Sequence, residues 1–155
     1  MHFHIRGLEP ERFTSLFTDP IQLAARGGRR VVADAPTGFP CRVSLEDARP
    51  GDELVLVPFE HHATPSPFRA SGPIYVRRHA PAPFDAIDRV PAMLRTRQLS
   101  VRGYDVYGNL AAAELGPGTE LEALIAALFG QPEVSYLHVH FAKPGCFACR
   151  VTRRN

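Results

Sequence analysis

The sequence predicts a single α+β domain with a mainly antiparallel or mixed sheet. The 155 residues are about the length of one domain, and no Pro/Gly/Ser-rich linker divides them. Apolar residues make up 45% of the chain and charged residues 22%, which is enough apolar material for a folded core. Several short strand-like segments follow one another with few helical segments between them, a pattern that favours α+β over a doubly wound parallel sheet. We therefore expect one domain over residues 1–155.

The first part of the chain is expected to hold a strand, short helices and a second strand. Residues 3–8 are typical of a strand, and residues 9–17 carry apolar side chains at helical spacing. Asp19 is a residue type that caps helices, and Pro20 suits the first helical position, so a second short helix should follow. Val-rich residues 29–34 then predict another strand.

The middle of the chain contains the clearest apolar strand, at residues 53–59. His61 and His62 lie at the end of this strand. Residues 63–73 are rich in Pro and Ser and predict a loop, after which residues 74–76 return to an extended pattern.

The following segments predict a hairpin and then the one clear amphipathic helix. Residues 99–105 and 110–115 flank a Gly-Asn turn, as in a β-hairpin. Residues 119–129 repeat apolar side chains at helical spacing, and Thr119 with Glu122 fits a capping box at the start of this helix.

Two histidines in the last predicted hairpin, residues 134–141 and 146–151, suggest a metal site. His138 and His140 are two residues apart, so on a strand they share a face, while their apolar neighbours point to the other side. Imidazole nitrogen suits zinc, iron or copper. The sequence therefore offers His138, His140 and Cys146 as a candidate metal-binding set that would suit zinc or iron, while the cofactor itself is not predicted.

The register of this hairpin decides which cysteine shares the histidine face. A three-residue turn places Cys146 on that face, whereas a four-residue turn places Cys149 opposite His138. Both alternatives remain open. So does a third, in which the histidines are partly exposed polar residues and the cysteines are small buried apolar ones.

Charge and cysteine content argue against several classes of partner and location. The chain has 18 Lys and Arg against 16 Asp and Glu, which leaves a net charge of only +2. Nucleic-acid-binding proteins usually carry a larger cluster of positive charge than this excess supplies. No segment approaches the ~20 apolar residues that cross a membrane, and no apolar signal segment follows Met1. Three cysteines cannot form a complete disulfide framework. We expect a cytoplasmic protein that binds neither nucleic acid nor membrane; the oligomeric state is not predicted.

Six short segments, spread over nearly the whole chain, form a recognisable set: residues 38–42, 44–45, 50–51, 66–74, 99–102 and 138–146. Together these segments resemble the bacterial family known as domain of unknown function 1203. The resemblance implies a small single-domain bacterial protein and assigns no activity, substrate or cofactor. It also implies that the family's motif segments contain Cys41, Arg42, Arg69, Arg102, Asp105, His140 and Cys146.

Polar residues beside turns and strand ends are the common feature of these segments, and binding groups are often supplied from such positions. Arginine binds carboxylates and phosphates in a bidentate manner, so converging arginines would bind a small anionic ligand. The leading hypothesis is a small-molecule-binding or enzymatic domain with an Arg/His/Cys pocket. Its candidate ligand-binding residues are Cys41, Arg42, His61, Arg69, Arg102, Asp105, His140 and Cys146.

The alternative is a non-catalytic interaction or structural protein whose polar residues hold loops, as Arg102 would do by pairing with Asp105. No serine lies in a Gly-x-Ser-x-Gly elbow, so no hydrolase motif favours the enzymatic hypothesis. The catalytic residues, if the protein is an enzyme, are not predicted.

Overall fold

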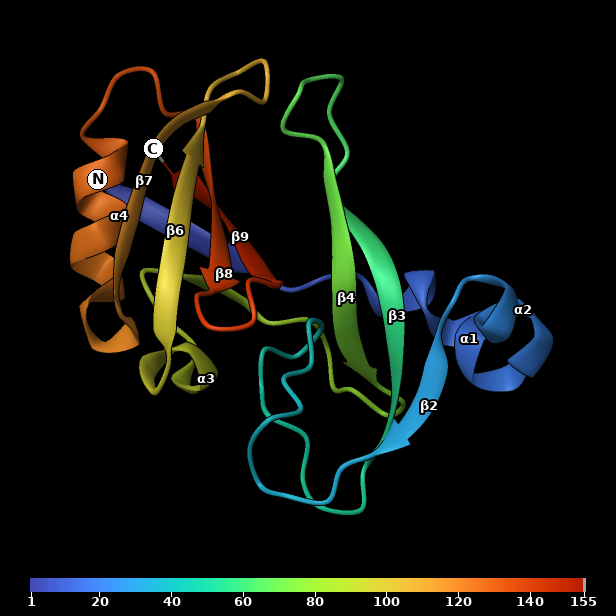
Figure 1. The fold of residues 1–155 in the computed structure, drawn as a ribbon. Helices are drawn as coiled ribbons and strands as arrows, with labels where there is room; N and C mark the ends of the chain where they lie inside the picture. The colour runs from blue at the N-terminus through green and yellow to red at the C-terminus, as the bar shows by residue number, and fades with distance from the viewer. Residues whose placement is uncertain (155) are drawn as a thin grey trace.

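Two antiparallel β-sheets of unequal size form most of the computed structural model, which describes residues 1–154 (Figure 1). The fold class is therefore α+β, as the sequence predicts. The strands are β1 His2–Arg6, β2 Arg29–Val32, β3 Glu53–His62, β4 Ala70–Arg77, β5 Asp85–Ile87, β6 Gln98–Tyr104, β7 Leu110–Pro117, β8 Tyr136–Phe141 and β9 Phe147–Arg154. The helices are α1 Thr14–Thr18, α2 Pro20–Ala25, α3 Ala92–Arg95 and α4 Leu121–Phe129, with 3₁₀ turns at Pro10–Arg12 and Gly118–Glu120.

The larger sheet has the strand order β5-β1-β9-β8-β6-β7, and every neighbouring pair is antiparallel. It contains both hairpins that the sequence predicts, β6–β7 and β8–β9. Helix α4 covers one face of this sheet (Figure 1). The core between them comes from alternate residues of the central strands, whose other residues point to the opposite face. Its buried side chains from β6, β8 and α4 include Leu99, Val101, Leu137, Val139, Leu121, Ile125 and Leu128.

Helix α4 begins differently from the capping box that the sequence suggests. A 3₁₀ turn at Gly118–Glu120 precedes the helix, Glu120 is the N-cap residue, and no side chain caps it. The Glu122 carboxylate instead pairs with Arg95 of α3. A Cβ atom at Gly118 would lie 1.7 Å from the Leu94 carbonyl oxygen. Close packing against α3 therefore fixes the entry to α4, and the predicted capping box is wrong.

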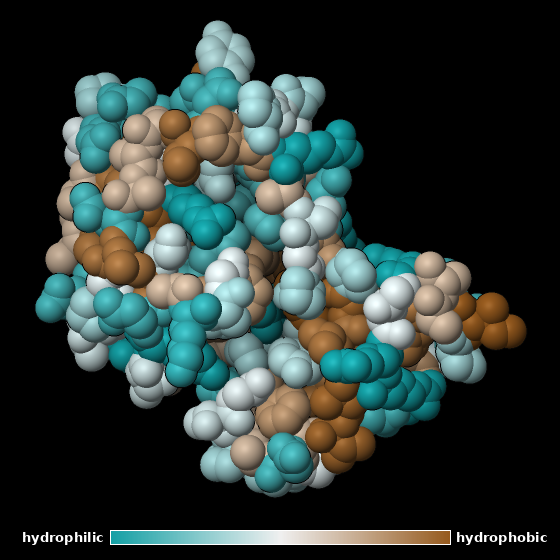
Figure 2. Space-filling view, in the orientation of Figure 1, coloured by the Kyte–Doolittle hydropathy of each residue, from teal (hydrophilic) through white to brown (hydrophobic). Residues whose placement is uncertain are grey.

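The smaller sheet has the order β2-β3-β4 and carries the short helices α1 and α2. The predicted cap of α2 is confirmed, because the Asp19 carboxylate accepts a hydrogen bond from the Gln22 N–H at 2.9 Å. In the view of Figure 2, apolar atoms lie over this sheet and toward the α2 end of the molecule, and α2 carries the exposed Ile21. The two short helices thus leave part of this unit's apolar surface uncovered.

The end of β3 and the loop after it join the smaller sheet to the larger one. The His62 ring nitrogen Nε2 lies 2.6 Å from the Tyr136 hydroxyl of β8. Beyond β3, the Ser66 hydroxyl donates to the Gly108 carbonyl at 2.8 Å, in the turn of the β6–β7 hairpin. These contacts place β3 against the face of the larger sheet opposite α4.

Candidate metal centre

Three histidines from the two sheets converge where β3 meets β8. His61 comes from β3, and His138 and His140 come from β8. One ring nitrogen from each residue lies within 4.8 Å of the other two. The junction between the sheets therefore holds a set of three imidazoles that are far apart in the sequence.

The alternation of side chains along β8 places His138 and His140 on the junction face. Val139 between them points into the α4-covered core, as the sequence predicts. On the neighbouring strand β6, Arg102 lies opposite His138 and Ser100 opposite His140. This face of the larger sheet is therefore polar and basic.

A β-bulge explains how β3 supplies His61 to the same place. Adjacent residues of a regular strand point to opposite faces, yet both His61 and His62 contact β8 side chains. The pairing of β3 with β4 shifts register between Phe59 and His62. A bulge reorients side chains at a strand end, and here it turns both imidazoles toward the larger sheet. The His61 ring also stacks on Phe147, with centroids 5.2 Å apart.

Each of the three histidines has a buried ring nitrogen without a hydrogen-bond partner among residues 1–154. These atoms are Nδ1 of His61, Nδ1 of His138 and Nε2 of His140. The other nitrogen of His140, Nδ1, lies 3.0 Å from the Gly145 carbonyl oxygen. A carbonyl only accepts, so Nδ1 carries the proton and Nε2 presents a lone pair. This pairing of a ring N–H with a carbonyl is typical of metal-binding histidines.

All three imidazoles are held in the neutral form that binds metal ions. Burial, together with smaller effects of the nearby His62 and Arg102, lowers the pKa of His61 to about 4. Burial also lowers the pKa of His140 to about 4, against the opposing effect of the Gly145 carbonyl. For His138, burial followed by the neighbouring His62 lowers the pKa to about 2. At neutral pH none of these rings needs to lose a proton before binding a metal.

The arrangement fits three ligands of a zinc-type site with one position open. Ligand atoms of a tetrahedral zinc site lie about 3.3 Å apart, so modest side-chain rotations would close the observed spacing. His61 and His138 line a pocket of about 430 Å³ that would give the fourth position access to water or a ligand. Three protein ligands with an open position characterise catalytic zinc sites, where the ion lowers the pKa of bound water to about 7.

Cys146 does not join this cluster, because a second bulge changes the register of the β8–β9 hairpin. Arg150 lies opposite His138 and Cys149 opposite the core residue Val139, but Phe147 then lies opposite His140. The register shifts between Val139 and His140. The register expected for a three-residue turn therefore holds from Tyr136 to Val139, and the register expected for a four-residue turn holds only at His140. Cys149 is buried in the core, and Phe147 occupies the histidine face. The Cys146 sulfur accepts a hydrogen bond from Arg42 Nη2 at 3.2 Å.

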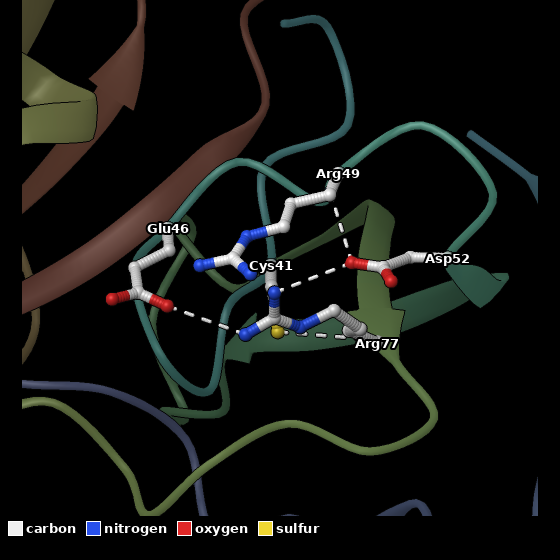
Figure 3. Close-up of polar contacts among 5 residues, drawn as sticks. All are labelled: Cys41, Glu46, Arg49, Asp52 and Arg77. Atoms are coloured by element: carbon white, nitrogen blue, oxygen red, sulfur yellow. Dashed lines mark hydrogen bonds and ion pairs between the residues drawn. The ribbon is translucent and has the colours of Figure 1, made fainter. Parts of the chain in front are cut away.

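Cys41 lies in a separate polar cluster, shown in Figure 3. Its buried sulfur accepts a hydrogen bond from the Arg77 backbone N–H at 3.4 Å. The Arg77 guanidinium joins Glu46 at 3.2 Å and Asp52 at 3.3 Å, and Asp52 also accepts from the Arg49 N–H at 2.9 Å. This network ties the loop before β3 to the end of β4.

The arginines of the candidate set are separated as well. Arg69 is exposed and forms a bidentate pair with Glu60, at 3.0 Å for each contact. Arg102 faces the histidines. Arg42 is buried beside Cys146. The structure therefore does not bring these three arginines into one pocket.

Asp105 closes the β6–β7 turn instead of pairing with Arg102. Its Oδ1 atom accepts from the backbone N–H groups of Tyr107 and Asn109, both at 2.8 Å. A carboxylate in this position stabilises the turn and leaves Arg102 directed along the histidine face.

The sequence places His61 with His140 in the candidate ligand-binding set, but it does not indicate that His61 joins His138 and His140 as a metal ligand. Two sequence features could have pointed to the cluster: His61 lies at the end of an apolar strand, and His138 and His140 are two residues apart, so they share one face of their strand. No local pattern states that these two strands belong to facing sheets, so the combination needed the tertiary structure.

The fold and the site together define an α+β protein of two antiparallel sheets with a three-histidine cluster at their junction. The chain belongs to the family described as Protein of unknown function (DUF1203), whose model matches residues 38–153. This segment contains all three histidines, and the match confirms the resemblance seen in the sequence. No curated protein and no solved structure matches the chain. Within residues 1–154, no helix has the length and apolar character to cross a membrane.

Proposed function

We propose that this protein binds one divalent transition-metal ion, most suitably zinc, through His61, His138 and His140. The single observation that carries the proposal is the convergence of three imidazoles, each of which offers one ring nitrogen within 4.8 Å of the others and has a buried ring nitrogen with no partner within residues 1–154. Buried polar atoms in folded proteins are almost always satisfied, and an unsatisfied group calls for an explanation. One metal ion would satisfy all three nitrogens at once.

Zinc is favoured because imidazole nitrogen is one of its common ligands and because zinc accepts a tetrahedral site with an open position. Iron(II) is the alternative, since three nitrogen ligands also suit it. The pocket beside His61 and His138 would let water or a small ligand complete the coordination.

We also propose that the protein works in the cytoplasm. The support is chemical: Cys41, Cys146 and Cys149 are all free thiols in the described chain. Free thiols persist most readily in a reducing compartment.

Titration of untagged, metal-stripped protein with Zn²⁺ and Fe²⁺ by calorimetry tests the metal proposal. We expect about one equivalent of zinc to bind, because the three ligands surround one point. His61→Gln, His138→Gln and His140→Gln should each weaken binding by about a hundredfold or more, since even loss of an outer partner of a ligand costs 10- to 100-fold. Cobalt(II) substitution should show the absorption bands of a tetrahedral ion.

His79→Gln is the matched control, because His79 is exposed and lies outside the cluster. It should bind zinc like the wild type. Zinc binding that survives replacement of His138, or the absence of any stoichiometric binding by folded wild-type protein, would contradict the proposal.

A further inference from the structure

We infer that a second site, separate from the histidine cluster, binds a small organic carboxylate with an apolar body. The site is a cavity of about 420 Å³ between the loop before β3 and the turn of the β8–β9 hairpin. Its main lining residues are Pro40, Arg42, Tyr75, Phe141, Lys143 and Cys146. This volume lies within the range of about 300 to 1,000 Å³ that is usual for small-molecule pockets.

The walls of this cavity are mostly apolar. Pro40, Tyr75, Phe141 and Pro144 are among the residues that line it. An apolar wall favours an apolar ligand body, because its burial removes hydrocarbon surface from water. Inorganic anions and highly polar ligands would not use these walls.

Arg42 supplies a buried positive charge at the cavity. Its side chain is 1% exposed, and its partners are the Phe147 carbonyl at 2.7 Å, the Pro40 carbonyl at 2.5 Å and the Cys146 sulfur at 3.2 Å. No carboxylate pairs with Arg42 in the described part of the chain. A guanidinium carries five N–H groups. Three are used here, and the other two have no partner in residues 1–154.

The second arginine at the cavity is already neutralised. Arg97 forms two contacts with Asp47, at 2.6 and 3.0 Å. Both Arg42 and Arg97 also lie over the Phe141 ring, each with its guanidinium carbon 5.1 Å from the ring centroid. Lys143 is exposed on the rim. The charge left without a partner at the cavity is therefore that of Arg42 and Lys143.

The apolar walls and the positive charge without a carboxylate partner together determine the ligand class. A carboxylate offers two oxygens in the geometry that a guanidinium binds best, and it compensates a buried charge that is otherwise costly. The apolar wall then takes a hydrocarbon chain or ring. None of His61, His138 and His140 lines this cavity, so the inference does not depend on the metal.

Hexanoate is a suitable probe, and 1-hexanol is its uncharged match. Calorimetry should show hexanoate binding at one site, with hexanol about tenfold weaker or more, because hexanol lacks the charge that pairs with Arg42. Lys143→Glu should weaken hexanoate binding by about threefold to tenfold. Arg26→Glu, an equal charge reversal at an exposed residue outside the cavity, should change it by less than about twofold. Zinc-loaded and metal-stripped protein should bind hexanoate equally.

Alkylation of Cys146 gives a second readout that does not require substitution of Arg42. Cys41 and Cys149 are 0% and 1% exposed, so only Cys146 should react with iodoacetamide in the folded protein. In that reaction the thiolate sulfur bonds to carbon and iodide leaves. Bound hexanoate should slow the labelling of Cys146 by about threefold or more at saturation.

Four results would overturn the inference. Equal binding of hexanoate and hexanol would mean that the cavity is only an apolar cleft. Equal losses in Lys143→Glu and Arg26→Glu would mean that the effect is one of net charge. Hexanoate that binds without slowing the labelling of Cys146, or inorganic phosphate that displaces it at equal concentration, would place the anion elsewhere or change its class.

Discussion

His138 is almost fully buried among aromatic side chains. Its side chain is 2% exposed, and the rings of His62, Tyr104 and Phe147 surround it with centroids 5.0 to 5.2 Å away. This aromatic shell removes water from the imidazole and leaves its Nδ1 atom without a partner in residues 1–154. Burial of an unpaired polar atom costs stability, which is consistent with a site kept for function rather than for folding.

The first prediction concerns acid stability of the metal-free protein. The pKa of all three histidines is lowered in the folded state, to about 4 for His61 and His140 and about 2 for His138. The unfolded chain, with an ordinary pKa near 6.5, therefore binds more protons below that pH. Stability should be independent of these groups above pH 6.5 and fall as the pH drops from 6.5 toward 4. Each fully neutral histidine contributes up to about 1.4 kcal/mol per pH unit, with less from the partly exposed His61.

Urea unfolding in EDTA at pH 7.5, 6.5 and 5.5 checks this dependence before most carboxylates titrate. His138→Gln should reduce the slope below pH 6.5, because glutamine takes up no proton on unfolding. The exposed His79→Gln should leave the slope as it is. A free energy of unfolding that stays constant down to pH 5 would show that the histidines are protonated in the folded state.

At the scale of elements, α4 determines how the larger sheet is covered. Leu128 is fully buried in the core of this sheet, whereas Leu124 is only partly buried at its margin. The sequence pattern places both residues in one apolar stripe and predicts equal burial. In the structure, Leu128 is buried more completely than Leu124.

We therefore expect unequal costs when these two side chains are shortened. Leu128→Ala should lower the free energy of unfolding by about 2 to 5 kcal/mol, as large core truncations do. Leu124→Ala should cost less than about 2 kcal/mol, because less apolar surface leaves water at that position. Urea unfolding of the two variants measures the difference. Equal losses would mean that α4 is rotated relative to the sheet.

Local patterns predicted the elements better than their connections. The β6–β7 and β8–β9 hairpins and the body of α4 follow from periodicity within a few residues. The bulges at Phe59–His62 and Val139–His140 do not, since one extra residue leaves no mark on the apolar pattern. The second bulge separates Cys146 from the histidines.

At the scale of the whole molecule, the candidate metal centre joins two sheets that otherwise have separate cores. The larger sheet packs with α4, and the smaller one packs with α1 and α2. His61 belongs to the smaller sheet, while His138 and His140 belong to the larger one. The pairing of distant strands depends on tertiary packing, and for that reason the sequence could supply the ligands but not their combination.

The final prediction follows from this placement, because an ion bound by all three histidines would tie the two sheets together. A ligand that binds only the folded state adds stability of RT ln(1 + [L]/Kd), which is about 2.7 kcal/mol at a hundredfold excess over Kd. Zinc at that excess should raise the melting temperature and slow amide hydrogen exchange in both β3 and β8. In His61→Gln, zinc should no longer protect β3, since the variant keeps ligands on the larger sheet alone. Zinc-dependent protection confined to β8 in the wild type would show that His61 is not a ligand and that the ion does not connect the sheets.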